Sequence, residues 1–181
     1  MMVTKTELIV EFVNTLHKHS SREDEDSLAT PEELAGWLRR NGLFEAGELT
    51  QSDVVDLIDL RESLRTLLLA NNAVEVDAGS AWAIIDDCAR RGRIELRFPE
   101  GVPQLVVSAA GVDRAVGQIV AHVHAALVEG TWPRLKACRA RGCEWAFYDN
   151  ARNQSRSWCS MSSCGNREKA RAFRRRHIAS A

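Results

Sequence analysis

Four cysteines near the carboxyl end constrain this chain more than any other sequence feature. Cys138 and Cys143 are separated by four residues, Cys159 and Cys164 are separated in the same way, and fifteen residues lie between the two pairs. Two close pairs joined by a short span can bring four thiolates to one tetrahedral Zn²⁺. The spacing therefore predicts one structural Zn²⁺ per chain, bound by these four cysteines. Free thiols and two disulfides remain as alternatives, and a reducing cytosol disfavours the disulfides.

This predicted zinc site has no position for a reactive water. Four cysteine ligands fill a tetrahedral shell, whereas catalytic zinc keeps one position open. The sequence also shows no Ser/His/Asp set, no phosphate-binding glycine loop and no converging carboxylates. We therefore expect that the protein is not an enzyme.

The chain before the cysteines is predicted to be mainly helical. Apolar residues make up 45% of the 181 residues, which is enough for a buried core. Apolar residues recur at helical spacing over segments 6–19, 31–41, 53–73, 80–91 and 112–127. Alternating polar and apolar residues at 93–98, followed by a turn and by residues 105–107, predict a small β-hairpin. The helix over 31–41 is predicted to begin after Thr30, because Thr30 can cap it and Glu33 completes a capping box.

A change in composition at Trp132-Pro133 predicts a division of the chain into residues 1–130 and residues 131–181. The second segment is too short to build a sufficient core by itself, so metal binding would supply folding energy there. The predicted fold class is thus mainly α with a small β-hairpin: a helical amino-terminal domain, then a four-cysteine zinc module that ends in a basic helix at 166–178.

Charge is distributed unevenly along the sequence. Residues 134–177 contain 12 Lys and Arg but 3 Asp and Glu, a formal charge of +9, whereas the rest of the chain carries −10. This asymmetry favours a polyanion partner for the carboxyl-terminal part, although a solvated basic face without a partner is the alternative. The candidate nucleic-acid contacts are Arg139, Arg141, Arg152, Arg156, Arg167, Lys169, Arg171, Arg174, Arg175 and Arg176.

Two parts of the sequence resemble a known pair of domains. Residues 164–167 read CGNR, after WCSM at 158–161 and CEWAFYD at 143–149, and they resemble the CGNR zinc-finger family. EFVNT at 11–15 and TPEELAGWL at 30–38 resemble the ABATE domain that precedes this finger. The sequence departs from the family pattern at Ala151 and Ser157, which could alter the nucleic-acid sequence bound. Asn166, two residues after the ligand Cys164, is a candidate for orienting the thiolates.

The resemblance implies a transcription regulator. Our leading interpretation is a zinc-dependent regulator that contacts double-stranded DNA through its carboxyl-terminal module. The alternatives are an RNA-binding zinc-ribbon-like protein and a protein-interaction adaptor. The resemblance also suggests a small-molecule effector for the amino-terminal domain, for which Asn14, Thr15 and His17 are candidates, and a homodimer is possible. No apolar run approaches the ~18 residues of a membrane span. Since we see no signal peptide, we expect a cytoplasmic protein without a membrane partner.

Overall fold

The computed structural model describes residues 5–17 and 25–178, and it confirms a mainly helical fold with small two-stranded sheets. The helices are α1 (Lys5–Val13), α2 (Pro31–Arg40), α3 (Gln51–Asn71), α4 (Ala78–Arg91), α5 (Gly111–Val128) and α6 (Asn166–Ile178). The strands form antiparallel pairs, which are β1 (Leu16–His17) with β2 (Glu25–Asp26), β3 (Ile94–Arg97) with β4 (Gln104–Val107), and β5 (Leu135–Ala137) with β6 (Ala146–Tyr148). Short helical turns are η1 (Pro99–Gly101), η2 (Trp132–Arg134) and η3 (Met161–Gly165).

Local capping fixes where the helices begin. The predicted capping box of Thr30 and Glu33 is present at the start of α2, and Gly42 beyond its end has a φ of 68°. Helix α3 begins two residues earlier than predicted, because Thr50 is its N-cap and Asp53 completes a second capping box. Each box satisfies backbone N–H groups that a helix end otherwise leaves without a partner.

The predicted first helix, 6–19, is too long. Helix α1 ends at Val13, Leu16 and His17 form β1, and residues 18–19 lie outside the described part of the chain. The side chain of Thr15 donates to the carbonyl of Phe12 at 2.8 Å, and Asn14 is hydrogen-bonded to the distant Ala146. Short polar side chains that bond in this way compete with the helical pattern.

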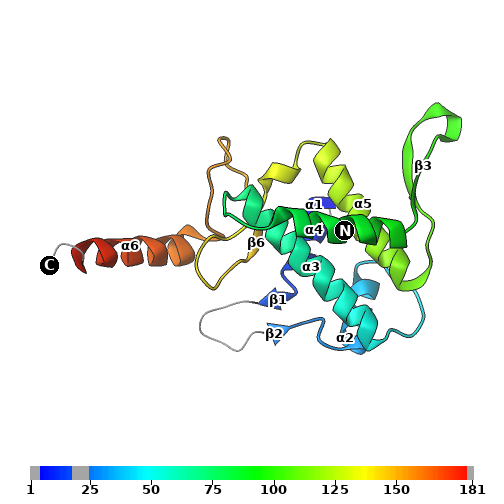
Figure 1. Cartoon of the computed structure of the whole chain (residues 1–181), viewed down its shortest axis with the longest axis horizontal. Coiled ribbons are helices and arrows are strands. Elements are labelled where there is room, and N and C mark those ends of the chain that lie inside the picture. Colours follow the sequence, from blue (N-terminus) through cyan, green and yellow to red (C-terminus); the bar gives the residue numbers. More distant parts are fainter. Residues whose placement is uncertain (1–4, 18–24, 179–181) are drawn as a thin grey trace.

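A single apolar core continues across the predicted boundary at residue 130. It contains the buried faces of α1, α3, α4 and α5, and it also includes Leu135, Ala137 and Ala146 from the β5–β6 hairpin. In Figure 1, α3 passes through the middle of this arrangement while α6 runs outward to the carboxyl end. The β5–β6 hairpin, which leads into and out of the first cysteine pair, is therefore packed on the helical part.

Candidate metal centre and basic surface

The first cysteine pair lies in the turn between β5 and β6. The backbone N–H of Cys138 donates to the carbonyl of Trp145 at 3.0 Å, and that of Cys143 donates to the carbonyl of Ala140 at 3.0 Å. Gly142 has a φ of 72°. This left-handed conformation is easily adopted by glycine, and it turns the chain so that both sulfurs face the same point.

The second pair frames η3, which leads directly into α6. The Ser160 hydroxyl accepts a hydrogen bond from the N–H of Ser163 at 3.3 Å, so the turn starts with its own cap. A Cβ on Gly165 would lie 2.4 Å from the Met161 sulfur, so a larger residue would push the Met161 side chain aside. The second ligand pair therefore fixes the base of α6, and Gly165 lets Met161 pack closely there.

The four sulfurs form one cluster whose dimensions fit a zinc ion. They all lie within 4.8 Å of one another, with Cys143 and Cys159 separated by 3.7 Å and Cys159 and Cys164 by 3.6 Å. A tetrahedral zinc with sulfur ligands at about 2.3 Å requires sulfur separations of about 3.8 Å. The cluster is thus a zinc site that Cys138, Cys143, Cys159 and Cys164 would fill completely, with Zn²⁺ joining two otherwise separate turns.

The thiols influence one another's ionisation strongly. Hydrogen bonds from Cys143 and Cys159 lower the pKa of the Cys138 thiol to about 2, although burial opposes this. The same hydrogen bond with Cys138 raises the pKa of the Cys143 thiol to about 12. The hydrogen bonds with Cys138 and Cys143 also raise the pKa of the Cys159 thiol well above its usual value. One thiolate therefore forms readily, whereas four thiolates require the positive charge of a metal.

One cationic side chain, that of Arg167, donates a hydrogen bond to a ligand sulfur. Its Nη2 lies 3.4 Å from the Cys164 sulfur, whereas the Asn166 amide donates to the carbonyl of Ser162 at 3.4 Å. The role that we assigned to Asn166 from the sequence stays a prediction, and Arg167 has the contact expected of such a residue.

Buried polar side chains at α3 donate hydrogen bonds to the backbone beside both cysteine pairs. The amide of Asn72, at the end of α3, donates to the carbonyls of Ala137 at 2.7 Å and Ser157 at 3.0 Å. Arg65 of α3 donates to the carbonyl of Glu144 at 2.9 Å. Ala137 directly precedes Cys138, Glu144 directly follows Cys143, and Ser157 lies two residues before Cys159. We call these contacts the α3 clasp.

A buried ion pair shapes the loop between the two cysteine pairs. The Lys136 ammonium donates to the Asp149 carboxylate at 2.7 Å, with both side chains almost fully buried. Asp149 also accepts from the N–H groups of Ala151 and Arg156. Burial raises the pKa of Asp149, but the Lys136 hydrogen bond and charge outweigh it, so the net shift is downward. The ion pair therefore fixes the loop that carries several of the candidate basic contacts.

The predicted basic residues fall into two groups. Arg167 and Arg171 are half-buried; Arg171 pairs with Glu168 at 2.5 Å, and the exposed Arg156 stacks 4.6 Å from the Phe147 ring centre. These three arginines already make contacts within the chain. The remaining predicted contacts are exposed, and they are Arg139, Arg141, Arg152, Lys169, Arg174, Arg175 and Arg176.

The aromatic residues of the module form a small second core. Phe147 is buried against Cys138, Cys143 and Cys164, and the half-buried Trp145 and Trp158 pack on this group. Phe173 lies outside this core, with its side chain 54% exposed on α6. The two tryptophans and Phe147 therefore support the zinc site.

The polar residues considered for an effector pocket have structural contacts instead. Asn14 pairs with the backbone of Ala146 in both directions, at 2.9 and 2.8 Å. Thr15 accepts from Arg61 at 3.2 Å, and the His17 ring meets the Trp145 ring edge-on at 4.5 Å. Since α1 ends before them, Asn14 and His17 do not share a helical face.

Two buried arginines of α3 were not predicted from the sequence, and of these Arg65 joins the two parts through the carbonyl of Glu144. Arg61 and Arg65 are buried in α3, where Arg61 forms two hydrogen bonds with Asp26 at 2.6 and 2.8 Å. The sequence contains a signal for these buried arginines, because Arg61 and Arg65 interrupt the apolar face of this helix. Buried charges are found paired, so two arginines at core positions indicate specific partners.

Comparison with known families agrees with this arrangement. Residues 134–177 match the CGNR zinc finger, and residues 6–140 match the ABATE family, described as "Putative stress-induced transcription regulator". No match was found among curated proteins. The overlap of the two matches, residues 134–140, covers β5 and Cys138, where the two parts share contacts. Because the ABATE match covers most of the chain, the protein belongs to the ABATE family, which carries that description, and it contains a CGNR zinc finger.

Proposed function

We propose that this protein regulates transcription by binding double-stranded DNA through α6 and the neighbouring loops. The observation that carries the proposal is the position of α6, which begins at the zinc site and runs outward from the molecule (Figure 1). The helix contains six Lys and Arg but one Glu, and its 13 residues extend over about 20 Å. A basic helix of this shape fits a major groove or follows a phosphate backbone.

The zinc site would set the direction of this helix. Cys164 and Arg167 anchor the first turn of α6, while Arg174 and Arg175 are exposed on its outer half. In the described part of the chain, neither of these two guanidinium groups has a side-chain partner. They are available to phosphates, and Arg139, Arg141 and Arg152 would add contacts from the loops.

Double-stranded DNA fits this surface better than single-stranded RNA. Single-stranded recognition relies on exposed aromatic rings on which bases stack. Here Phe147 is buried, and Trp145 and Trp158 pack around the zinc ligands. Phe173 is exposed on α6, but it is one ring among six Lys and Arg on that helix, so charge dominates the surface and suits a duplex backbone.

The remaining roles are assigned as part of this proposal. Residues 1–130 would sense an effector or a partner and residues 131–181 would contact DNA, with both parts joined by the shared core. The chain would act as a regulator and not as an enzyme. None of the described helices is long and apolar enough to cross a membrane. A cytoplasmic location would keep the four cysteines reduced, as zinc binding requires.

The test is a comparison of nucleic acids with the zinc-loaded full chain. Fluorescence anisotropy should show tighter binding to duplex DNA than to a single-stranded RNA of the same length and sequence. Arg174→Ala and Arg175→Ala should each weaken duplex binding while zinc content stays unchanged. Arg90→Ala is the control, because Arg90 is also an exposed arginine but lies on α4. Its binding should equal that of the original chain.

The alternatives predict different results in the same assay. Preference for the single-stranded RNA would support the RNA-binding interpretation. If the zinc-loaded chain binds neither nucleic acid at ~50 mM salt, where phosphate contacts are strong, the DNA proposal is wrong and the adaptor interpretation takes its place.

A further inference from the structure

The β3–β4 hairpin exposes apolar side chains that alternate with charged ones along β3, as they do in a strand with one buried face. Ile94 and Leu96 alternate with Glu95 and Arg97, and they pair with Val107 and Leu105 on one face of the hairpin. Alternation of this kind indicates a strand with one face covered. Yet Leu96 is 61% exposed, because the outer half of the hairpin extends beyond the helices (Figure 1). The outer part of the apolar face thus lacks a cover within this chain.

The most exposed apolar side chains belong to the β3–β4 hairpin and to the end of α5. Among the described residues, the four most exposed large apolar side chains are Val128 at 72%, Phe98 at 62%, Leu96 at 61% and Val102 at 56%. Phe98 and Val102 flank the turn at the tip of the hairpin, and Val128 ends α5. Clustered exposed apolar side chains mark interaction sites. We call these four residues the hairpin patch.

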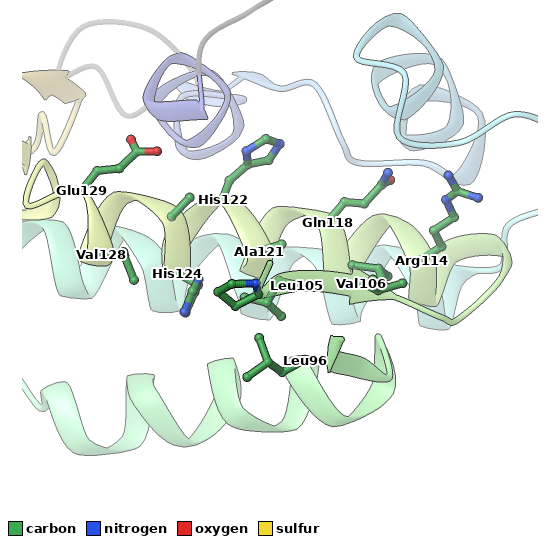
Figure 2. A pocket seen from close by; sticks show the side chains of 13 residues that line it. Leu96, Leu105, Val106, Arg114, Gln118, Ala121, His122, His124, Val128 and Glu129 are labelled. Atoms are coloured by element: carbon green, nitrogen blue, oxygen red, sulfur yellow. The ribbon is translucent and has the colours of Figure 1, made fainter. Parts of the chain in front are cut away.

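A groove lies beside the patch, between the hairpin and α5. Its volume is about 750 Å³, and its apolar lining includes Leu96, Leu105, Ala121, Ala125 and Val128. Figure 2 shows Leu96 and Leu105 on one side of α5 and the polar chains of Arg114, Gln118, His122 and Glu129 along the other.

The groove also contains a polar group that lacks a partner. The Oε1 atom of Gln118 is buried, and no hydrogen-bond donor in the described chain reaches it. Buried acceptors are nearly always satisfied, so this one indicates an incoming donor. If the Gln118 side chain turns into the groove, the backbone N–H groups of an entering hairpin turn can supply that donor.

We propose that a second copy of this chain covers the groove, with the hairpin tip of each copy inserted into the groove of the other. A protruding tip and a hollow on the same surface are self-complementary, which is what a two-fold symmetric dimer requires. Phe98 is the anchor, because a large aromatic ring that fills an apolar pocket dominates interface energetics.

The charges around the tip and the groove match in this arrangement. Arg97 and Glu100 lie on either side of Phe98, and Glu129 and Arg114 line opposite ends of the groove. Arg97 pairs with Glu95 on its own strand at 2.8 Å. Insertion of Phe98 would let Arg97 exchange this partner for Glu129 of the other copy, while Glu100 would meet Arg114. Complementary charges at the rim fix the register of an interface. This match favours a second copy over an uncharged ligand as the occupant.

The test measures the mass of the zinc-loaded full chain by sedimentation equilibrium without DNA. We expect twice the monomer mass of 20.2 kDa. Phe98→Asp should weaken dimerisation on the order of a hundredfold, since a symmetric dimer contains the contact twice. Phe173→Asp is the matched control, because Phe173 is 54% exposed on α6, and the dimer should persist.

A charge reversal tests the register separately. Arg97→Glu and Glu129→Arg should each weaken the dimer, and the double variant should recover much of the loss. Far-UV circular dichroism and zinc content should match the original chain in every variant. A chain that stays monomeric at ~100 µM, well above the Kd of specific interfaces, would overturn the proposal, as would a Phe98→Asp variant that dimerises like the original chain. Because no zinc ligand or DNA contact takes part, either result would leave the DNA proposal standing.

Discussion

Replacing Asn72 by alanine should destabilise the zinc module and the helical part together. The Asn72 side chain is 4% exposed, and its amide makes the two hydrogen bonds of the α3 clasp to Ala137 and Ser157. A buried hydrogen bond contributes about 0.5–1.5 kcal/mol, and a carbonyl left without a partner costs about 1–3 kcal/mol. Because Ser157 also accepts from the N–H of Arg139, the penalty falls mainly on one carbonyl. We expect a loss of about 2–4 kcal/mol in the free energy of unfolding.

Urea unfolding of the zinc-loaded chain measures this loss. Tryptophans occur in both parts, with Trp37, Trp82 and Trp132 in the larger core and Trp145 and Trp158 beside the zinc ligands. Their fluorescence and the far-UV circular dichroism should change in one coincident transition, as for a single cooperative unit. The melting temperature of Asn72→Ala should fall by roughly 5–15 °C for a chain of this size.

The exposed Asn150 provides the control. Asn150→Ala should change the free energy of unfolding by less than about 0.5 kcal/mol, as surface substitutions do. If Asn72→Ala has an equally small effect, the clasp does not join the two parts. Two separate transitions in the original chain would also contradict the reasoning.

Three further substitutions test other contacts. Lys136→Met leaves the Asp149 carboxylate buried without its cation and should cost about 3–5 kcal/mol in urea unfolding. Gly117→Ala places a Cβ 2.9 Å from the Cα of Gly92, where α5 meets the end of α4, and should cost about 1–3 kcal/mol in the same assay. Burial alone would raise the pKa of Asp26, but the hydrogen bond and charge of Arg61 lower it by more, so the pKa lies below 3.8. The stability that this carboxylate adds is present above its unfolded pKa and is lost as pH falls through the folded value. The unfolding free energies of the original chain and Asp26→Asn should therefore differ at neutral pH and converge in strong acid.

Features encoded by neighbouring residues could be predicted from the sequence. The capping box of Thr30 and Glu33 depends on a spacing of three residues, and both cysteine pairs close within one turn each. Helix α6 and its basic face also follow from a continuous segment. The zinc site was predictable because ligand spacing limits how the chain can fold around a metal.

Features that depend on distant partners could not be predicted in this way. Arg65 bonds to a carbonyl 79 positions away, and the amide of Asn72 bonds to carbonyls 65 and 85 positions away. Nothing in the local pattern identifies those partners, because they are backbone groups available at every residue. The composition change at Trp132 suggested two parts, whereas the core contains residues from both sides of it.

The dependence of duplex DNA binding on salt tests the central claim most directly. If exposed arginines of α6 and the loops neutralise about four to six phosphates, log Kd should change with log salt concentration by a slope of about 4–5. The measurement uses the zinc-loaded full chain and fluorescence anisotropy from 50 to 200 mM salt. We predict this steep slope, a decrease of about one unit in Arg174→Ala, and no decrease in Arg90→Ala. Binding that is independent of salt, or a slope that Arg174→Ala leaves unchanged, would contradict the assignment of α6 as the DNA-contacting element.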